Sequence, residues 1–134
     1  MRVARIGHVN IRTPLMEETL GFYETFLGLR RGPAVLAVMR ADNVWLYDAQ
    51  DVPLIHVNLS LPGEAVPPAG YASRLDHVAF DCTGLQTCRA RLIEGGVPFR
   101  EQPLPARRLH QINLRDPNGV KVELTFSADE EAAD

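Results

Sequence analysis

Several short stretches of the chain alternate apolar and polar residues, which is the pattern of half-buried β-strands. In the first of them, Val9 and Ile11 alternate with His8, Asn10 and Arg12. Residues 53–60, 75–81 and 119–126 show the same period of two. Because successive side chains of a strand point to opposite faces, we expect the apolar set to face a helix and the polar set to face away from it.

Two other stretches have the spacing of amphipathic helices. The first follows Thr13, the predicted N-cap, begins at Pro14 and stops at Gly28. Its predicted buried side consists of Leu15, Thr19, Phe22, Tyr23 and Phe26. The second helix covers residues 85–94 and ends at Gly95 or Gly96. Its predicted buried side consists of Leu85, Cys88 and Leu92.

The order of these elements repeats along the chain. Three strand-like runs follow the first helix, at 33–40, 43–48 and 53–60. Three more follow the second helix, at 97–101, 107–116 and 119–126, and the sequence DPNG at 116–119 is typical of a hairpin turn. We therefore predict an α+β fold of two βαβββ modules, whose curled mixed sheets surround a concave face.

The predicted modules belong to a single domain that covers residues 1–126. The first module spans residues 1–60 and the second spans residues 75–126, and the Pro- and Gly-rich stretch 61–74 joins them. Residues 127–134 are acidic and lack large apolar side chains, so we expect a disordered tail.

Four residues with metal-ligand chemistry occupy repeat-related polar positions. His77 lies 69 residues after His8, and Glu123 lies 67 residues after His56. A single histidine on a strand is more often a structural residue than a ligand, but four matching positions favour a site. Three imidazoles and a carboxylate suit Zn²⁺, Mn²⁺, Fe²⁺, Co²⁺ or Ni²⁺. His56 has an alternative role as an acid/base beside the metal, and we count Glu123 and His56 as the candidate catalytic groups.

Other side chains on the polar side are candidate substrate contacts. These are Arg12, Asn58, Asn113 and Arg115, and solvated strand-end charge is an equal explanation for the two arginines. Trp45 and Tyr47 share a parity and would line a cavity or pack against a partner subunit. His110 has the parity of apolar neighbours, so we leave it out of the site and place it at a strand edge or against a helix.

Composition narrows the class of protein. The net charge is −3 and no basic cluster is present, so we expect no nucleic-acid partner. No apolar run is long enough to cross a membrane, and the N-terminus lacks a signal-peptide core, so we expect a cytoplasmic protein without a membrane partner. Cys82 and Cys88 have neither metal-pair nor redox-motif spacing, which indicates reduced thiols in or near the core.

The chain resembles the vicinal oxygen chelate superfamily, which includes glyoxalase I, extradiol dioxygenases, methylmalonyl-CoA epimerase and the fosfomycin- and bleomycin-resistance proteins. The motifs that carry the resemblance are GHVNIRTP with FYETFLGL, LDHVAF, and RDPNGVKVELTF. The resemblance covers residues 3–126. It implies metal ligands on the first and last strand of each module, which here are His8, His56, His77 and Glu123.

The resemblance implies a metal-dependent enzyme that acts on a small oxygen-rich substrate through two neighbouring oxygens. Isomerase or lyase chemistry and extradiol dioxygenase chemistry both stay open. Glyoxalase I-like members usually have Glu at the position of His56, whereas extradiol enzymes use two histidines and a glutamate. The fosfomycin-modifying pattern includes a cationic, serine-bearing loop that this chain lacks. The alternative is a non-catalytic small-molecule binding protein of the bleomycin-resistance type. The resemblance also implies a homodimer.

Overall fold

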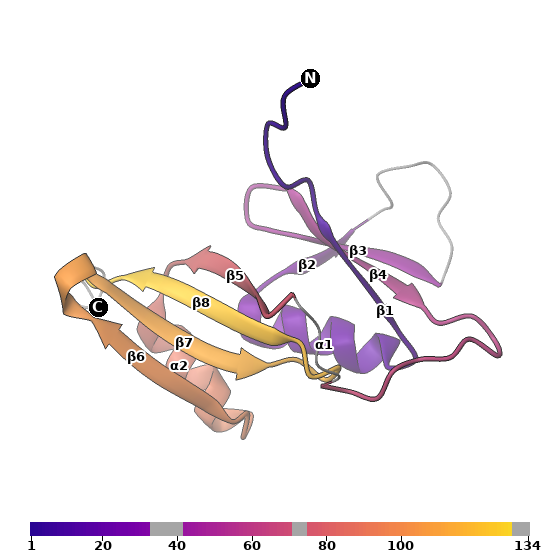
Figure 1. Ribbon diagram of the computed structural model, residues 1–134. Coiled ribbons are helices and arrows are strands. Elements are labelled where there is room, and N and C mark those ends of the chain that lie inside the picture. The colour runs from indigo at the N-terminus through magenta and orange to yellow at the C-terminus, as the bar shows by residue number, and fades with distance from the viewer. Residues whose placement is uncertain (33–41, 71–74, 130–134) are drawn as a thin grey trace. The chain divides into compact units, whose positions relative to one another are not determined.

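A computed structural model of the chain describes residues 1–32, 42–70 and 75–129 (Figure 1). The chain divides into two compact units, residues 1–67 (unit 1) and residues 68–134 (unit 2). In both units a helix follows the first strand, and the three remaining strands complete a four-stranded sheet. The predicted architecture of two βαβββ modules is therefore confirmed.

Unit 1 has a mixed sheet with the strand order β1-β4-β3-β2. Its elements are β1 (Val9–Thr13), α1 (Met16–Leu27), β2 (Arg30–Gly32), β3 (Asn43–Tyr47) and β4 (Pro53–Leu59). β1 and β4 run parallel, and the other pairs are antiparallel. Its core contains Leu20 and Tyr23 of α1 together with Leu46, Ile55 and Val57 of the sheet, all nearly fully buried.

Unit 2 repeats this plan with the strand order β5-β8-β7-β6. Its elements are β5 (His77–Cys82), α2 (Leu85–Glu94), β6 (Phe99–Leu104), the short 3₁₀ helix η1 (Pro105–Arg107), β7 (Leu109–Arg115) and β8 (Lys121–Ser127). Helix α2 lies behind the sheet in Figure 1. Leu85, Cys88 and Leu92 form its buried side, as predicted, and Gly95 is its C-cap.

The strand registers of the two units match position by position. Asn10 pairs with His56 between β1 and β4, and Ala79 pairs with Glu123 between β5 and β8. Alternate residues of β4 and β8 are buried, which confirms the predicted parity. In each unit the opposite side of the sheet is here called its polar face. It carries His56 in unit 1, and His77 and Glu123 in unit 2.

The first helix begins later than predicted. Thr13 is the last residue of β1 and its Oγ1 accepts the N–H of Leu15 at 2.9 Å, so it shapes the strand-to-helix turn. Leu15 is the N-cap and the helix starts at Met16, which places Pro14 before the helix. The predicted end is confirmed, because Gly28 has a φ of 69° and its N–H reaches the Tyr23 carbonyl.

Other boundaries differ by a few residues. β6 begins at Phe99 and continues to Leu104, where the predicted strand covered residues 97–101. The predicted strand 33–40 lies outside the described residues. The described strand β2 ends directly before it, at Gly32. The DPNG turn is confirmed, because the Gly119 N–H donates to the Asp116 carbonyl at 2.9 Å. None of the helices described in the chain is both long and apolar enough to span a membrane.

Candidate functional site

The candidate residues of unit 1 gather around Trp45. Trp45 pairs with His56 across β3 and β4, so both side chains stand on the polar face. Their rings are stacked with centroids 4.4 Å apart and planes 7° apart. His8, which directly precedes β1, lies edge-on with its ring centroid 4.7 Å from that of Trp45 and 6.1 Å from that of His56.

A hydrogen bond fixes the orientation of His56. Its Nε2 lies 2.5 Å from Oδ1 of Asn43, and an amide oxygen only accepts, so Nε2 carries the proton of the neutral ring. Nδ1 of His56 is then left with a lone pair. Burial, and secondarily the nearby His8, lower the pKa of His56 below its ordinary value, which favours this neutral form.

The candidate residues of unit 2 stand on neighbouring strands. His77 of β5 is opposite Lys121 of β8, and Glu123 lies two residues further along β8 on the same polar face. Nδ1 of His77 lies 3.0 Å from Oδ2 of Asp76, whose other oxygen accepts a 2.5 Å bond from Lys121. The bonds from Lys121 and from His77 lower the pKa of Asp76. Asp76 therefore holds the His77 ring and leaves its Nε2 available.

Glu123 is held by its neighbour on β7. Its Oε1 accepts a hydrogen bond from Nε2 of Gln111 at 2.8 Å, which leaves Oε2 available. The donor atoms that remain are thus Nδ1 of His56, Nε2 of His77 and Oε2 of Glu123. Imidazole nitrogen with carboxylate oxygen is a donor set that suits a divalent transition metal, and a histidine ligand commonly has its second nitrogen bound to a carboxylate.

The structure places His8 beside His56 in unit 1, and His77 on the strand next to that of Glu123 in unit 2. Among the residues that the structure describes, no three His, Cys, Asp or Glu side chains gather closely enough to hold a metal ion. The residues fit a metal by their chemistry and by their equivalent registers. A common ion for His8, His56, His77 and Glu123 remains a prediction.

The predicted substrate contacts differ in how far they are already engaged. In unit 1, Arg12 forms an ion pair with Glu64 at 3.1 Å, and Oδ1 of Asn58 accepts a 2.5 Å bond from Asn10. The bonds from the Leu61 backbone and from Arg12 lower the pKa of Glu64.

In unit 2, Arg115 donates to the Gly119 carbonyl at 2.6 Å. The side chain of Asn113 has no hydrogen-bond partner among the described residues.

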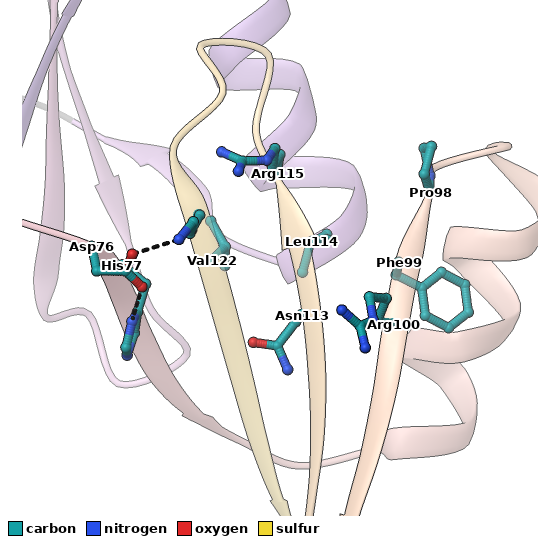
Figure 2. A pocket seen from close by; sticks show the side chains of 10 residues that line it. Asp76, His77, Pro98, Phe99, Arg100, Asn113, Leu114, Arg115 and Val122 are labelled. Atoms are coloured by element: carbon teal, nitrogen blue, oxygen red, sulfur yellow. Dashed lines mark hydrogen bonds and ion pairs between the residues drawn. The ribbon is translucent and has the colours of Figure 1, made fainter. Parts of the chain in front are cut away.

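A pocket of about 490 Å³ opens at one end of the polar face of unit 2 (Figure 2). His77, Arg100, Asn113, Arg115 and Lys121 bring polar side chains to its lining. Sequence reasoning missed Arg100, because the predicted strand 97–101 was too short to establish which side of the sheet it faces. It missed Asn43 as the partner of His56 for a similar reason, since that contact depends on strand register.

His110 lies away from the polar face, as predicted. It is 7% exposed, shares the buried parity of Ile112, and its Nε2 lies 2.7 Å from Oε2 of Glu101. Arg89 of α2 holds the same carboxylate with bonds of 2.7 and 2.8 Å. Both cysteines are free thiols, and burial raises the pKa of Cys88, so its thiol is not activated.

Comparisons with known proteins agree with this architecture. A glyoxalase family protein from Bacillus anthracis has a TM-score of 0.71 and 21% identity, and the match covers 95% of this chain and 98% of that one. A glyoxylase/bleomycin resistance protein/dioxygenase domain from Frankia sp. EAN1pec also has a TM-score of 0.71, with 16% identity and coverage of 94% and 93%.

The fosfomycin resistance protein FosX from Listeria monocytogenes has a TM-score of 0.67 and 14% identity, with coverage of 94% of this chain and 95% of that one. At these identities the likeness shows the fold alone. No curated protein matches the chain. A family model does match, over residues 5–124, which is most of the chain. The resemblance read from the motifs is thereby confirmed, and the chain belongs to the Glyoxalase/Bleomycin resistance protein/Dioxygenase superfamily.

Proposed function

We propose that the chain is a metal-dependent enzyme that acts on a small oxygen-rich substrate bound through two neighbouring oxygens. His8, His56, His77 and Glu123 would hold a divalent cation of Fe, Mn, Ni, Co or Zn. The reaction is of the isomerase or lyase type or of the extradiol dioxygenase type. We further propose a cytoplasmic homodimer, since members of the superfamily often pair their modules between chains.

The observation that carries this proposal is the shared register of the two units. Asn10 faces His56 in one sheet as Ala79 faces Glu123 in the other, and a histidine lies two positions before Asn10 and two before Ala79. Packing against the helices does not require polar donors at these positions, because His56 and His77 alternate with the buried or half-buried apolar residues of β4 and β5.

A relative with the same fold supports the choice of ligand chemistry. A variant of FosX was solved with Mn(II) and 1S,2S-dihydroxypropylphosphonic acid, a compound that has two neighbouring hydroxyl oxygens. That variant is 13% identical to this chain. The complex supports testing a divalent metal first, together with a vicinal diol or carbonyl compound as the candidate substrate.

A bound cation would supply Lewis acidity toward the substrate oxygens. The residues of the chain would perform the remaining tasks. Asp76 orients the ring of His77, and Gln111 orients the carboxylate of Glu123. Because His56 has a lowered pKa and a proton on Nε2, its Nδ1 is suited either to bind the cation or to accept a proton from the substrate.

The first test is elemental analysis of the purified protein, followed by metal titration of His77→Ala. We expect about one divalent ion per site in the wild-type protein and loss of that ion in His77→Ala. His110→Gln is the matched control, since it keeps a donor toward Glu101 and should retain the metal. Wild-type protein that neither contains nor binds a divalent ion, or a His77→Ala protein with unchanged affinity, would contradict the proposal. Redox-active iron would favour the dioxygenase branch, and nickel or zinc the isomerase or lyase branch.

A second candidate function is the binding of an aromatic compound without catalysis. The stacked rings of Trp45 and His56 favour it, since Trp45 is 8% exposed and the half-buried His56 ring stacked on it gives the polar face an aromatic pair that a ligand ring could join. Quenching of Trp45 fluorescence by aromatic ligands in chelator-treated protein would support this function, if the metal titration above is negative.

A further inference from the structure

We infer that the pocket of unit 2 binds an oxyanion group of the substrate, a carboxylate or a phosphate-type group, through Arg100 and Asn113. The inference rests on the proposed function, in that it takes the polar face as the side where substrate binds. It adds the chemical class of the substrate, which is a small anion. It also adds Arg100, a residue that the motifs do not point to.

Strand register places Arg100 and Asn113 side by side. The two residues pair directly across the antiparallel strands β6 and β7, so their side chains stand on the same face. Opposed side chains of this kind have Cβ atoms about 5 Å apart. The next row of the same face contains Arg115 opposite Lys121, and Lys121 opposite His77. The pocket thus lies over two adjacent rows of one rigid sheet.

The charges in the pocket are unbalanced. Its lining contains three cationic side chains, Arg100, Arg115 and Lys121, and a single carboxylate, Asp76. Lys121 is already paired with that carboxylate. The side chain of Arg115 donates to the Gly119 carbonyl and forms no ion pair with a carboxylate in the part of the chain that is described, so its positive charge is uncompensated there.

The side chains of Arg100 and Asn113 are not engaged within the part of the chain that is described. Neither side chain forms a hydrogen bond or an ion pair with a described residue, although the two backbones pair across β6 and β7. Figure 2 shows the guanidinium of Arg100 extending from β6 toward the side of the sheet where Asn113 stands. A guanidinium offers a planar fork of N–H donors that matches two oxygens of an oxyanion, and an amide NH₂ adds a further donor.

The fold itself does not require cations at these positions. The equivalent pair of unit 1 consists of Gly32 and Trp45, which face each other across β2 and β3. A sheet with the same topology and register therefore forms with a glycine and an aromatic residue there. Solvation of an exposed arginine would explain Arg100 alone, but not its grouping with Arg115 and an unpaired amide in a chain of net charge −3.

The position of the pocket relates the anion to the proposed chemistry. His77 lines the same pocket, and its Nε2 is the donor atom left available by Asp76. An oxyanion held by Arg100 and Asn113 would therefore lie beside a proposed metal ligand. The expected substrate is therefore a small anion in which the charged oxyanion group is close to the two oxygens that would bind the metal.

The test uses the full chain after removal of metal with a chelator, so that it does not depend on the metal site. Inorganic phosphate and acetate are titrated separately at low ionic strength, with the side-chain amide signals of Asn113 followed by ¹H–¹⁵N NMR. We expect saturable shifts of these signals. The anion that binds more tightly identifies whether the group is phosphate-like or a carboxylate. Higher salt should weaken the binding.

Arg100→Gln should weaken the binding of that anion about tenfold or more, the loss expected for a charge-assisted hydrogen bond. Arg107→Gln is the matched control, because Arg107 is an exposed arginine of η1 at the other end of β6 and does not line the pocket. Equal affinities in the two variants, or the absence of saturable shifts with either anion, would overturn the inference. If His77→Ala loses the metal but anion binding is intact, the anion site is supported independently of the metal site. If the wild-type protein binds metal normally but binds neither anion, the anion site is refuted and the proposed metal site is not.

Discussion

At the scale of single residues, the environment of His56 determines its protonation. Burial and the neighbouring His8 lower the pKa of His56 from its ordinary value of 6.5. We predict that His8→Ala raises this pKa, because the substitution removes a nearby positive charge and also exposes the ring. A ¹H NMR titration of the His56 Cε1–H in metal-free protein measures the change. An unchanged or lower pKa in His8→Ala would show that His8 does not influence His56.

The same shift has a consequence for stability. Since the folded state lowers the pKa of His56, the unfolded chain takes up the proton first as the pH falls. The stability that the neutral ring contributes is present above pH 6.5 and is lost as the pH falls through the folded-state pKa. His8→Ala should reduce this loss, which denaturant unfolding at pH 7.5 and pH 5.5 would measure.

Side-chain parity explains why part of the candidate site could be predicted from the sequence. Alternation alone placed His56 and Glu123 on the face opposite the core, and the structure agrees. The bond from His56 to Asn43 and the pair formed by Arg100 and Asn113 depend on which residue faces which across two strands. A pattern along one strand does not contain that register.

At the scale of elements, a polar network connects α2 to its sheet. Glu101 of β6 accepts bonds from Arg89 of α2 and from His110 of β7. The bond from Arg89, followed by that from His110, lowers the pKa of Glu101 below its ordinary value of 4.5. The stability from this carboxylate is therefore present above pH 4.5 and is lost as the pH falls through its folded-state pKa.

We predict that Glu101→Gln destabilises the protein by about 1 kcal/mol at pH 7, because charge-assisted bonds at a partly exposed site become neutral ones. The difference from wild type should shrink at pH 3.5, where the wild-type carboxyl is increasingly protonated. Urea unfolding at the two pH values measures both effects. Glu94→Gln, at the exposed end of α2, is the control and should change little. If the difference in unfolding free energy between Glu101→Gln and wild type is as large at pH 3.5 as at pH 7, the loss would come from altered packing and not from the lost charge.

The turn between β7 and β8 requires glycine for two reasons. Gly119 has a φ of +76°, and a Cβ added there would lie 2.2 Å from the backbone nitrogen of Gly70. Gly96 has a φ of +62°, but a Cβ there would meet nothing within 4 Å. Comparing alanine substitutions at Gly96 and Gly119 therefore distinguishes the cost of backbone strain, which both share, from the cost of steric overlap, which only Gly119 has.

We predict that Gly96→Ala costs about 1 kcal/mol, the price of a left-handed alanine, and that Gly119→Ala costs clearly more. The excess arises because residues 69–70, which donate the Gly70 N–H to the Asn118 carbonyl at 2.8 Å, must move. Thermal or denaturant unfolding of both variants measures it. Equal losses of stability in the two variants would show that residues 69–70 can move away from the added Cβ without a measurable free-energy cost.

Element boundaries depended on local contacts that the sequence leaves open. Thr13 has the chemistry of an N-cap, and its hydroxyl does accept a backbone N–H, but from Leu15 two residues later. That bond closes a turn before the helix, so α1 starts at Met16. Gly28 was predictable as the end because a glycine with positive φ is a common helix stop and no side chain competes with it.

At the scale of the whole molecule, one backbone plan carries two different chemistries. The row that contains Gly32, Trp45, His56 and Asn10 in unit 1 corresponds in register to the row of Arg100, Asn113, Glu123 and Ala79 in unit 2. In this row one unit thus has the nearly buried aromatic ring of Trp45, and the other has the cation of Arg100. The repeat itself could be read from the sequence, because its spacing of 67 to 69 residues is nearly constant. The difference between the two polar faces could be recognised only from the strand register, which the sequence does not contain.

If the two pairs of ligands hold one cation, binding must stabilise both units together. We predict that adding Mn²⁺ or Zn²⁺ to metal-free protein slows backbone amide exchange in β1 and β4 of unit 1 and also in β5 and β8 of unit 2, since a ligand bound only to the native state suppresses local opening. Hydrogen–deuterium exchange with mass spectrometry measures each strand. His77→Ala, although it changes unit 2, should abolish the protection of both units, whereas His110→Gln should retain it. Protection confined to one unit would mean that its own residues hold the ion and that the common site does not form.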